Sequence, residues 1–240
     1  MPRGLPDYYN PDTLVSQRLA NVEEVVTAVQ GIANLDNRGR TLYYTHFAEG
    51  LGGWTTSKTG DGVLAVASTA EAEIDPACML IKAGTQSGSG ISHASKQFIV
   101  HNIKSAGVEF SFIYYPNMPS LLLTFSYNNG TDYVHGRVTI DENAKVIQVW
   151  DDTTPTNVFT LPASLPVYGW LTLKLVCDFI TPAYVRLLVG LDQYDISEYE
   201  IKSTDTLQPG ILNAKISATA QGDGVNIAYI GHVAITIDEP

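Results

Sequence analysis

Three carboxylates alternate in the segment AEAEID, residues 70–75, where Glu71, Glu73 and Asp75 occupy every second position. On a β-strand this spacing places all three side chains on one face. Glycoside hydrolysis requires two carboxylates beside the sugar linkage, one as general acid and the other as base or nucleophile. Pro76 follows at once, so we interpret the segment as a solvated acidic turn, with a hydrolase as the enzymatic alternative.

Histidine-assisted nucleophilic catalysis has no recognisable motif in this sequence. A catalytic Ser or Cys needs a histidine as base and an acid to orient it, and the sequence has no G-x-S-x-G elbow. His46, His135 and His232 fall at expected strand positions, where a histidine is ordinary. We therefore predict no catalytic residue and a protein that is not an enzyme.

Two acidic loops offer oxygen ligands of the kind that calcium prefers. They hold Asp151 and Asp152 in WDDTTPTN, and Asp192 and Asp195 in GLDQYDISE. Neither loop has EF-hand spacing, and a chain with a net charge of −11 is expected to have acidic loops without any ion. No Cys/His cluster suggests zinc. We expect no metal and no other cofactor.

The two cysteines, Cys78 and Cys177, lie far apart in the sequence and inside apolar runs. We interpret both as buried free thiols. A disulfide between them stays open as the alternative, although a domain of this length does not need a covalent cross-link to fold.

Carbohydrate binding needs exposed aromatic rings on which sugars can stack, with amides and carboxylates for the hydroxyl groups. Trp54, Tyr114 and Tyr115 are our aromatic candidates for this role. Tyr114 and Tyr115 are adjacent, so alternation on a strand turns one of them outward. The alternative is that Trp54 and Trp170 fill the core between two sheets and that the tyrosines lie at half-buried edges.

The composition excludes several classes of partner. The chain has 240 residues, of which 45% are hydrophobic and 16% charged, as in a folded domain with a sizeable core. A net charge of −11 without a basic stripe argues against nucleic acid and disfavours an anionic membrane surface. The sequence has no run of about eighteen apolar residues and no signal-peptide core, so we expect synthesis in a cytoplasm.

Residues 10–33 are predicted to form one amphipathic helix, which a proline-rich arm precedes. Its apolar residues are spaced 4-3-4-3, the heptad pattern of helices that bundle with their own copies. These residues are Val15, Leu19, Val22, Val26 and Val29. The arm carries Leu5, Tyr8 and Tyr9, which we expect to lie on a partner surface. The alternative is that the helix packs on the β-domain of its own chain.

From Thr41 onward the sequence has the pattern of about a dozen short strands separated by turns. Residues 120–140 predict the clearest hairpin, with Asn128, Asn129 and Gly130 at its turn. Many short strands and no second helix predict an all-β, antiparallel β-sandwich. We divide the chain into the arm and helix at residues 1–36 and the β-sandwich domain at residues 37–240.

Two stretches resemble known families. Phe47, Gly50, Leu51 and Trp54, followed later by WLTLKLVCDF, YVRLLVGLDQYDIS and AYIGHVAIT, resemble the laminin-G or concanavalin-like jelly-roll sandwiches. The opening LPDYYNPDTLVSQRLANVEEVV is similar to the start of virion proteins of tailed bacteriophages, where a short helix precedes a lectin-like sandwich. Together these resemblances imply a phage structural protein, such as a capsid decoration or cement protein, and such proteins are commonly trimers.

The sequence-based prediction is therefore a non-enzymatic virion protein, assembled in the host cytoplasm. The helix is predicted to hold a homotrimer together, and the arm to bind the major capsid protein or another virion protein. Multivalent attachment would then stabilise the shell. The alternative is a carbohydrate-binding module on a phage head or tail, for which glycans are the partner.

Overall fold

The computed structural model describes residues 38–71, 77–115, 117–161, 169–205, 210–223 and 226–240. Within these ranges all regular secondary structure is β-strand and every strand pairing is antiparallel, which confirms the predicted all-β fold. The strands of these ranges are β1 (Arg40–Thr45), β2 (Thr55–Gly60), β3 (Val63–Ser68), β4 (Cys78–Lys82), β5 (Gly90–Ile99), β6 (Ser105–Tyr114), β7 (Ser120–Asn128), β8 (Asp132–Asp141), β9 (Val146–Asp151), β10 (Thr154–Thr160), β11 (Gly169–Asp178), β12 (Ala183–Val189), β13 (Asp192–Asp195), β14 (Lys202–Asp205), β15 (Ile211–Thr219) and β16 (Ile227–Ile237).

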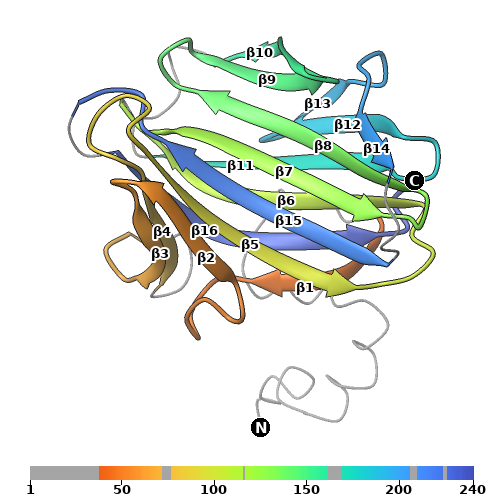
Figure 1. Ribbon diagram of the computed structural model, residues 1–240, viewed down its shortest axis with the longest axis horizontal. Coiled ribbons are helices and arrows are strands. Elements are labelled where there is room, and N and C mark those ends of the chain that lie inside the picture. Colours follow the sequence, from red (N-terminus) through yellow and green to blue (C-terminus); the bar gives the residue numbers. More distant parts are fainter. Residues whose placement is uncertain (1–37, 72–76, 116, 162–168, 206–209, 224–225) are drawn as a thin grey trace, which may run out of the picture.

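The strands form two eight-stranded sheets, one in front of the other in Figure 1. Sheet A has the order β13-β12-β11-β6-β16-β4-β3, and β1 also pairs with β16. Sheet B has the order β10-β9-β8-β7-β15-β5-β2, and β14 also pairs with β8. Sheet B is the front layer in Figure 1, with β7, β15 and β5 running across its middle. Because β15 pairs with both β5 and β7, the sheet brings distant parts of the sequence together.

The core lies between the two sheets and follows from alternation along the strands. On β7, Leu121, Leu123 and Phe125 are buried. On β6 of the other sheet, Phe110 and Phe112 are buried, with ring centroids 5.6 Å apart. Full burial of a Leu or Phe side chain contributes about 1.5–3 kcal/mol. Such side chains therefore supply most of the attraction between the sheets.

The hairpin predicted at Asn128, Asn129 and Gly130 is confirmed, since it joins β7 to β8. The Asn129 side-chain oxygen accepts hydrogen bonds from the backbone N–H groups of Thr131 and Asp132, at 2.9 and 2.7 Å. Gly130 has a φ of 102°, which a residue with a Cβ rarely adopts. The side chain of Asn129 and the freedom of Gly130 together fix the register of the hairpin.

A buried group of charges joins the last residues of the chain to the outer side of sheet A. The Glu239 carboxylate forms ion pairs with Lys174, at 2.7 Å, and with Arg186. Arg186 also donates to the backbone oxygen of Pro240 at 2.7 Å. Nearby, His232 Nε2 lies 3.1 Å from Glu109 Oε1. Charges buried this deeply are tolerated only when they are paired, so Glu239 stabilises two buried cations.

Both cysteines are buried and free, as the sequence predicted. Burial raises the pKa of Cys78 to about 11, and burial also raises the pKa of Cys177. Neither thiol is therefore a reactive thiolate at neutral pH.

Several sequence predictions concern residues outside the described ranges. They are the helix at 10–33 with its apolar stripe (Val15, Leu19, Val22, Val26 and Val29) and the arm residues Leu5, Tyr8 and Tyr9. In the part of the chain that is described, no helix is long and apolar enough to cross a membrane.

Candidate functional site

Sheet B presents a polar outer surface. On β15, Leu212, Ala214 and Ile216 are buried in the core, so Asn213 and Lys215 point to the opposite side of the sheet. The neighbouring strands β5, β7 and β8 alternate in the same way. We call the resulting surface the polar face, and it consists of His93, Gln97, Thr124, Ser126, Asn128, Tyr133, His135, Arg137, Thr139, Trp150, Lys202, Thr204, Asn213, Lys215 and Ser217.

Strand register arranges these residues in rows. Asn213 lies opposite Gln97 on β5 and opposite Ser126 on β7. Ser126 lies opposite His135 on β8, which lies opposite Lys202 on β14. The next row along the strands holds Ser95, Lys215, Thr124 and Arg137. Residues directly opposite each other on adjacent strands are about 5 Å apart, so each row is a continuous line of polar groups.

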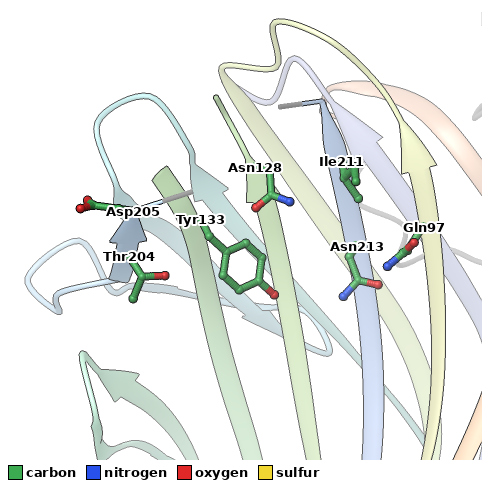
Figure 2. Close-up of a pocket in the computed structure, with 7 residues that line it drawn as sticks. All are labelled: Gln97, Asn128, Tyr133, Thr204, Asp205, Ile211 and Asn213. Carbon is green, nitrogen blue, oxygen red and sulfur yellow. The ribbon is translucent and has the colours of Figure 1, made fainter. Parts of the chain in front are cut away.

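A pocket of about 360 Å³ opens at one end of the polar face (Figure 2). Its lining residues are Gln97, Asn128, Tyr133, Thr204, Asp205, Ile211 and Asn213. They belong to the strands β5, β7, β8, β14 and β15. Figure 2 shows Asn128 of β7 between Tyr133 and Asn213. The Tyr133 hydroxyl donates to Ser126 Oγ at 2.9 Å, which holds the ring in place. The pocket thus combines three amides, one fixed aromatic ring and one apolar side chain, Ile211.

Four buried polar atoms of the polar face have no hydrogen-bond partner among the described residues. They are Asn128 Oδ1, His135 Nε2, Arg137 Nε and Asn213 Oδ1. A buried polar atom without a partner costs about 1–3 kcal/mol, and native proteins contain only a few. These four atoms are the majority of the seven such atoms found in the described residues, and they gather on one surface.

The two histidines of the polar face are neutral at pH 7. Burial lowers the pKa of His135 to about 4, helped by the positive charges of Arg137 and Lys202 and opposed by Asp152. Burial and the charge of Lys215 lower the pKa of His93. A neutral imidazole carries one donor and one acceptor nitrogen. His93 Nδ1 lies 2.9 Å from Ser217 Oγ, whereas His135 Nε2 has no partner among the described residues.

The edge of β8 is divided between two strands, and this division positions Arg137. β9 pairs with β8 from Val138 to Asp141, and β14 pairs with the other half, from Asp132 to His135. At the division, the Tyr184 hydroxyl from sheet A accepts from the Arg137 N–H at 3.0 Å and donates to the Trp150 carbonyl at 2.9 Å. The hydroxyl of this core tyrosine therefore bridges two backbone groups of adjacent strands, the Arg137 N–H and the Trp150 carbonyl, in place of a direct hydrogen bond between them.

Gly136 makes room for this tyrosine. A Cβ at this position would lie 2.6 Å from Cys177 Sγ and 3.0 Å from Tyr184 Cε1. On the outer side, the Arg137 guanidinium lies 4.1 Å from the centre of the Trp150 ring and donates to the Asp152 carbonyl at 2.6 Å. Arg137 is therefore held between a ring and a backbone oxygen.

The aromatic candidates nominated from the sequence are not on the polar face. Trp54 and Tyr114 are each only 6% exposed and belong to the core, and Tyr115 is half-buried against the core. Trp54 also donates from Nε1 to the Tyr43 hydroxyl at 3.2 Å. This burial corrects the proposed stacking role for Trp54 and Tyr114, because neither ring has a face open to a sugar. The alternative prediction, that Trp54 is a core residue, is confirmed by its burial. Trp170, for which the same alternative was given, is only half-buried.

The acidic candidates serve local structure where they are described. Asp151 Oδ1 accepts from the Glu200 N–H at 2.6 Å, and Asp195 Oδ1 accepts from the Ser197 N–H at 3.0 Å. Among the described residues, no group of three or more His, Cys, Asp or Glu side chains is arranged to hold a metal ion. Glu71 is exposed, and Glu73 and Asp75 lie outside the described residues.

The sequence analysis did not nominate Asn128, Asn213, His135 or Arg137. A signal was present in the segments YVHGRVTI and LNAKISATA, where outward polar residues alternate with apolar or small ones. This alternation indicates which side chains point outward. It does not indicate that the two segments belong to one sheet with β7 between them.

No protein-family model matches the chain, and no curated protein sequence is similar to it. Solved structures of the same fold exist. The cellulose-induced protein Cip1 has a TM-score of 0.52 at 12% identity, over 81% of this chain and 96% of that one. A carbohydrate esterase of the Shiga toxin-encoding bacteriophage phi24B has a TM-score of 0.50 at 14% identity, over 84% of this chain and 100% of that one. At these identities the likeness shows the fold alone: the chain is a concanavalin-like, two-sheet β-sandwich.

Proposed function

We propose that the protein binds carbohydrate on the polar face, at and beside the pocket of Figure 2. The observation that carries the proposal is the group of unpaired polar atoms on this face, at Asn128, His135, Arg137 and Asn213. A sugar presents a dense array of hydroxyl groups, each able to donate and accept. It can therefore satisfy an amide oxygen, a neutral imidazole and a guanidinium N–H at the same time.

The shape of the site supports the same ligand class. A pocket of about 360 Å³ is within the range of small-ligand sites, which is roughly 300–1,000 Å³. Tyr133 offers an aromatic ring, and Asn128, Asn213 and Gln97 offer amides within the same lining. The amides lie on three adjacent strands, so their spacing is fixed by the sheet and not by a loop. A rigid row of this kind suits a repeating ligand such as a polysaccharide.

We propose binding without catalysis. Glycoside hydrolysis needs two carboxylates about 5 to 9.5 Å apart across the scissile bond. Among the described lining residues the carboxylate is that of Asp205, and in Figure 2 it points away from Tyr133 and Asn128. The fold occurs in a phage carbohydrate esterase, so hydrolysis of any bound saccharide should be measured together with binding.

A glycan array with the full-length protein tests the proposal. We expect selective signals, which the double variant Asn128→Ala/Asn213→Ala should reduce at least tenfold, because each amide loses its bonds to sugar hydroxyls. The matched control is Asn157→Ala, since this exposed residue of β10 pairs with Gln148 at the far edge of sheet B. Absence of any glycan signal, or equal signals from the wild type and the double variant, would overturn the proposal.

For the place of action we propose the particle of a tailed bacteriophage, with the helix at 10–33 as the trimer contact and the arm as anchor, as in a capsid decoration protein. The support is the resemblance of the N-terminal sequence, together with a fold that also occurs in a phage protein. Light scattering of the full chain and of residues 37–240 tests it. A trimer that becomes a monomer on truncation supports the proposal, and a monomer in both cases contradicts it.

A further inference from the structure

We infer that the saccharide bound by the polar face is acidic, with carboxylate or sulfate groups on its sugar rings. This inference rests on the proposed function and adds the chemical class of the ligand. It follows from three cations that the fold places on the polar face, Arg137, Lys202 and Lys215.

Three cations on one face are unexpected, because the protein as a whole carries a negative net charge. The chain has 14 Lys and Arg residues against 25 Asp and Glu residues. The buried cation Lys174 has a carboxylate partner, in its ion pair with Glu239. Within the described residues, Arg137, Lys202 and Lys215 form no ion pair. Three positive charges of the described residues thus form no ion pair on the surface where polar atoms are also unpaired, and the nearby carboxylate of Asp152 acts on Arg137 only through its charge.

The cations surround the amides and are not scattered. Lys215 follows Asn213 by two residues on β15, which is about 7 Å along the same face. Arg137 follows His135 by two residues on β8, and Lys202 lies directly opposite His135. Lys215 and Arg137 share a row, two strands and about 10 Å apart. A chain of sugars lying on the face would meet amides and cations in turn.

The Arg137 side chain is held in a fixed position and still has hydrogen-bonding capacity for an anion. Its guanidinium is fixed by the Trp150 ring and by the Asp152 carbonyl, yet its buried Nε has no partner. A carboxylate or sulfate would complete its hydrogen bonds, and charge-assisted bonds of this kind are about twice as strong as neutral ones. Burial is the main cause of the low pKa of His135, and the positive charges of Arg137 and Lys202 lower this pKa further, against the charge of Asp152.

The test compares an acidic polymer with its own neutral form and with a second polymer that carries sulfate. Calorimetry would measure binding of polygalacturonate, its fully methyl-esterified and therefore neutral form, and dextran sulfate. We expect the acidic polymers to bind at least tenfold more tightly than the neutral ester, and the difference to shrink as salt rises. Preference for polygalacturonate would assign the anion as carboxylate, and preference for dextran sulfate as sulfate.

Variants separate a specific site from general attraction. Lys215→Gln and Arg137→Gln should each weaken binding of the acidic polymer about tenfold, and they should leave binding of the neutral ester unchanged. Lys104→Gln removes the same charge from an exposed position before β6 and should have no effect. Equal affinity for acidic and neutral forms would overturn the inference while leaving the proposed function standing. Equal losses in Lys104→Gln and Lys215→Gln would also overturn it. Failure of every saccharide on the glycan array would instead overturn the proposed function.

Discussion

Replacement of Tyr184 by Phe removes a single oxygen atom, and the structure indicates a large cost. The Tyr184 hydroxyl is the hydrogen-bond partner of the Arg137 N–H and of the Trp150 carbonyl at the point where β8 and β9 separate. In the variant both backbone groups stay near the core without that partner. A buried unpaired group costs about 1–3 kcal/mol, so Tyr184→Phe should lower the free energy of unfolding by about 2–4 kcal/mol.

The matched control is Tyr127→Phe. Tyr127 is also a core tyrosine, only 3% exposed, but its hydroxyl makes one long hydrogen bond of 3.4 Å to the Val100 carbonyl. The loss of one weak hydrogen bond should cost less than about 1 kcal/mol. Urea denaturation followed by tryptophan fluorescence measures both variants under identical conditions. Equal destabilisation in Tyr184→Phe and Tyr127→Phe would refute the role assigned to the hydroxyl between β8 and β9.

Three further predictions concern stability. Glu239→Gln should destabilise the fold by about 3–5 kcal/mol, because it removes the negative charge between two buried cations. Asp238→Asn, which affects an exposed ion pair, should cost less than about 1 kcal/mol. The midpoints of urea denaturation of the two variants and the wild type measure this difference. Gly136→Ala should cost about 1–3 kcal/mol in the same assay, since its Cβ would overlap Cys177, and a neutral result would mean that the sheets can separate without penalty. The third prediction concerns pH, because His135 has a pKa of about 4 in the folded protein against an ordinary value of 6.5. As the pH falls, the unfolded chain binds a proton at His135 before the folded protein does, so stability present at pH 7 is lost between about pH 6.5 and pH 4. The variant His135→Gln should therefore lose less stability than the wild type between pH 7 and pH 5.

The strands that the sequence predicted are those with apolar residues at every second position. The segment of β7 and β8 is an example, because its leucines and valines mark one face and Asn129-Gly130 marks the turn. β2 and β14 were missed, since their sequences TTSKTG and KSTD contain no apolar side chain. Both are edge strands that form because a neighbouring strand offers backbone N–H and C=O groups for pairing. This pairing does not depend on the types of the side chains, so the local sequence does not predict it.

The site was harder to predict than the fold, and the reason lies in the sheet order. Alternation alone turns Asn213 and His135 outward. Only the pairing of β15 with β7 places them in one row, and these strands are more than eighty residues apart in the sequence. Trp54 is a residue for which the sequence left both burial and exposure open. It follows a glycine-rich turn, where no periodicity indicates whether a ring points into the core, and its burial depends on contacts with Phe47 and Tyr43.

The central claim is that carbohydrate binds on the polar face of sheet B. The most direct measurement is NMR of the ¹⁵N-labelled protein, with assigned side-chain resonances, during titration with the saccharide that gives the strongest array signal. The account predicts saturable shifts of the Asn128 and Asn213 side-chain amides, while the Trp54 indole N–H, buried beside Tyr43, stays unchanged. Shifts that appear elsewhere in the sandwich while both amides remain unchanged would contradict it.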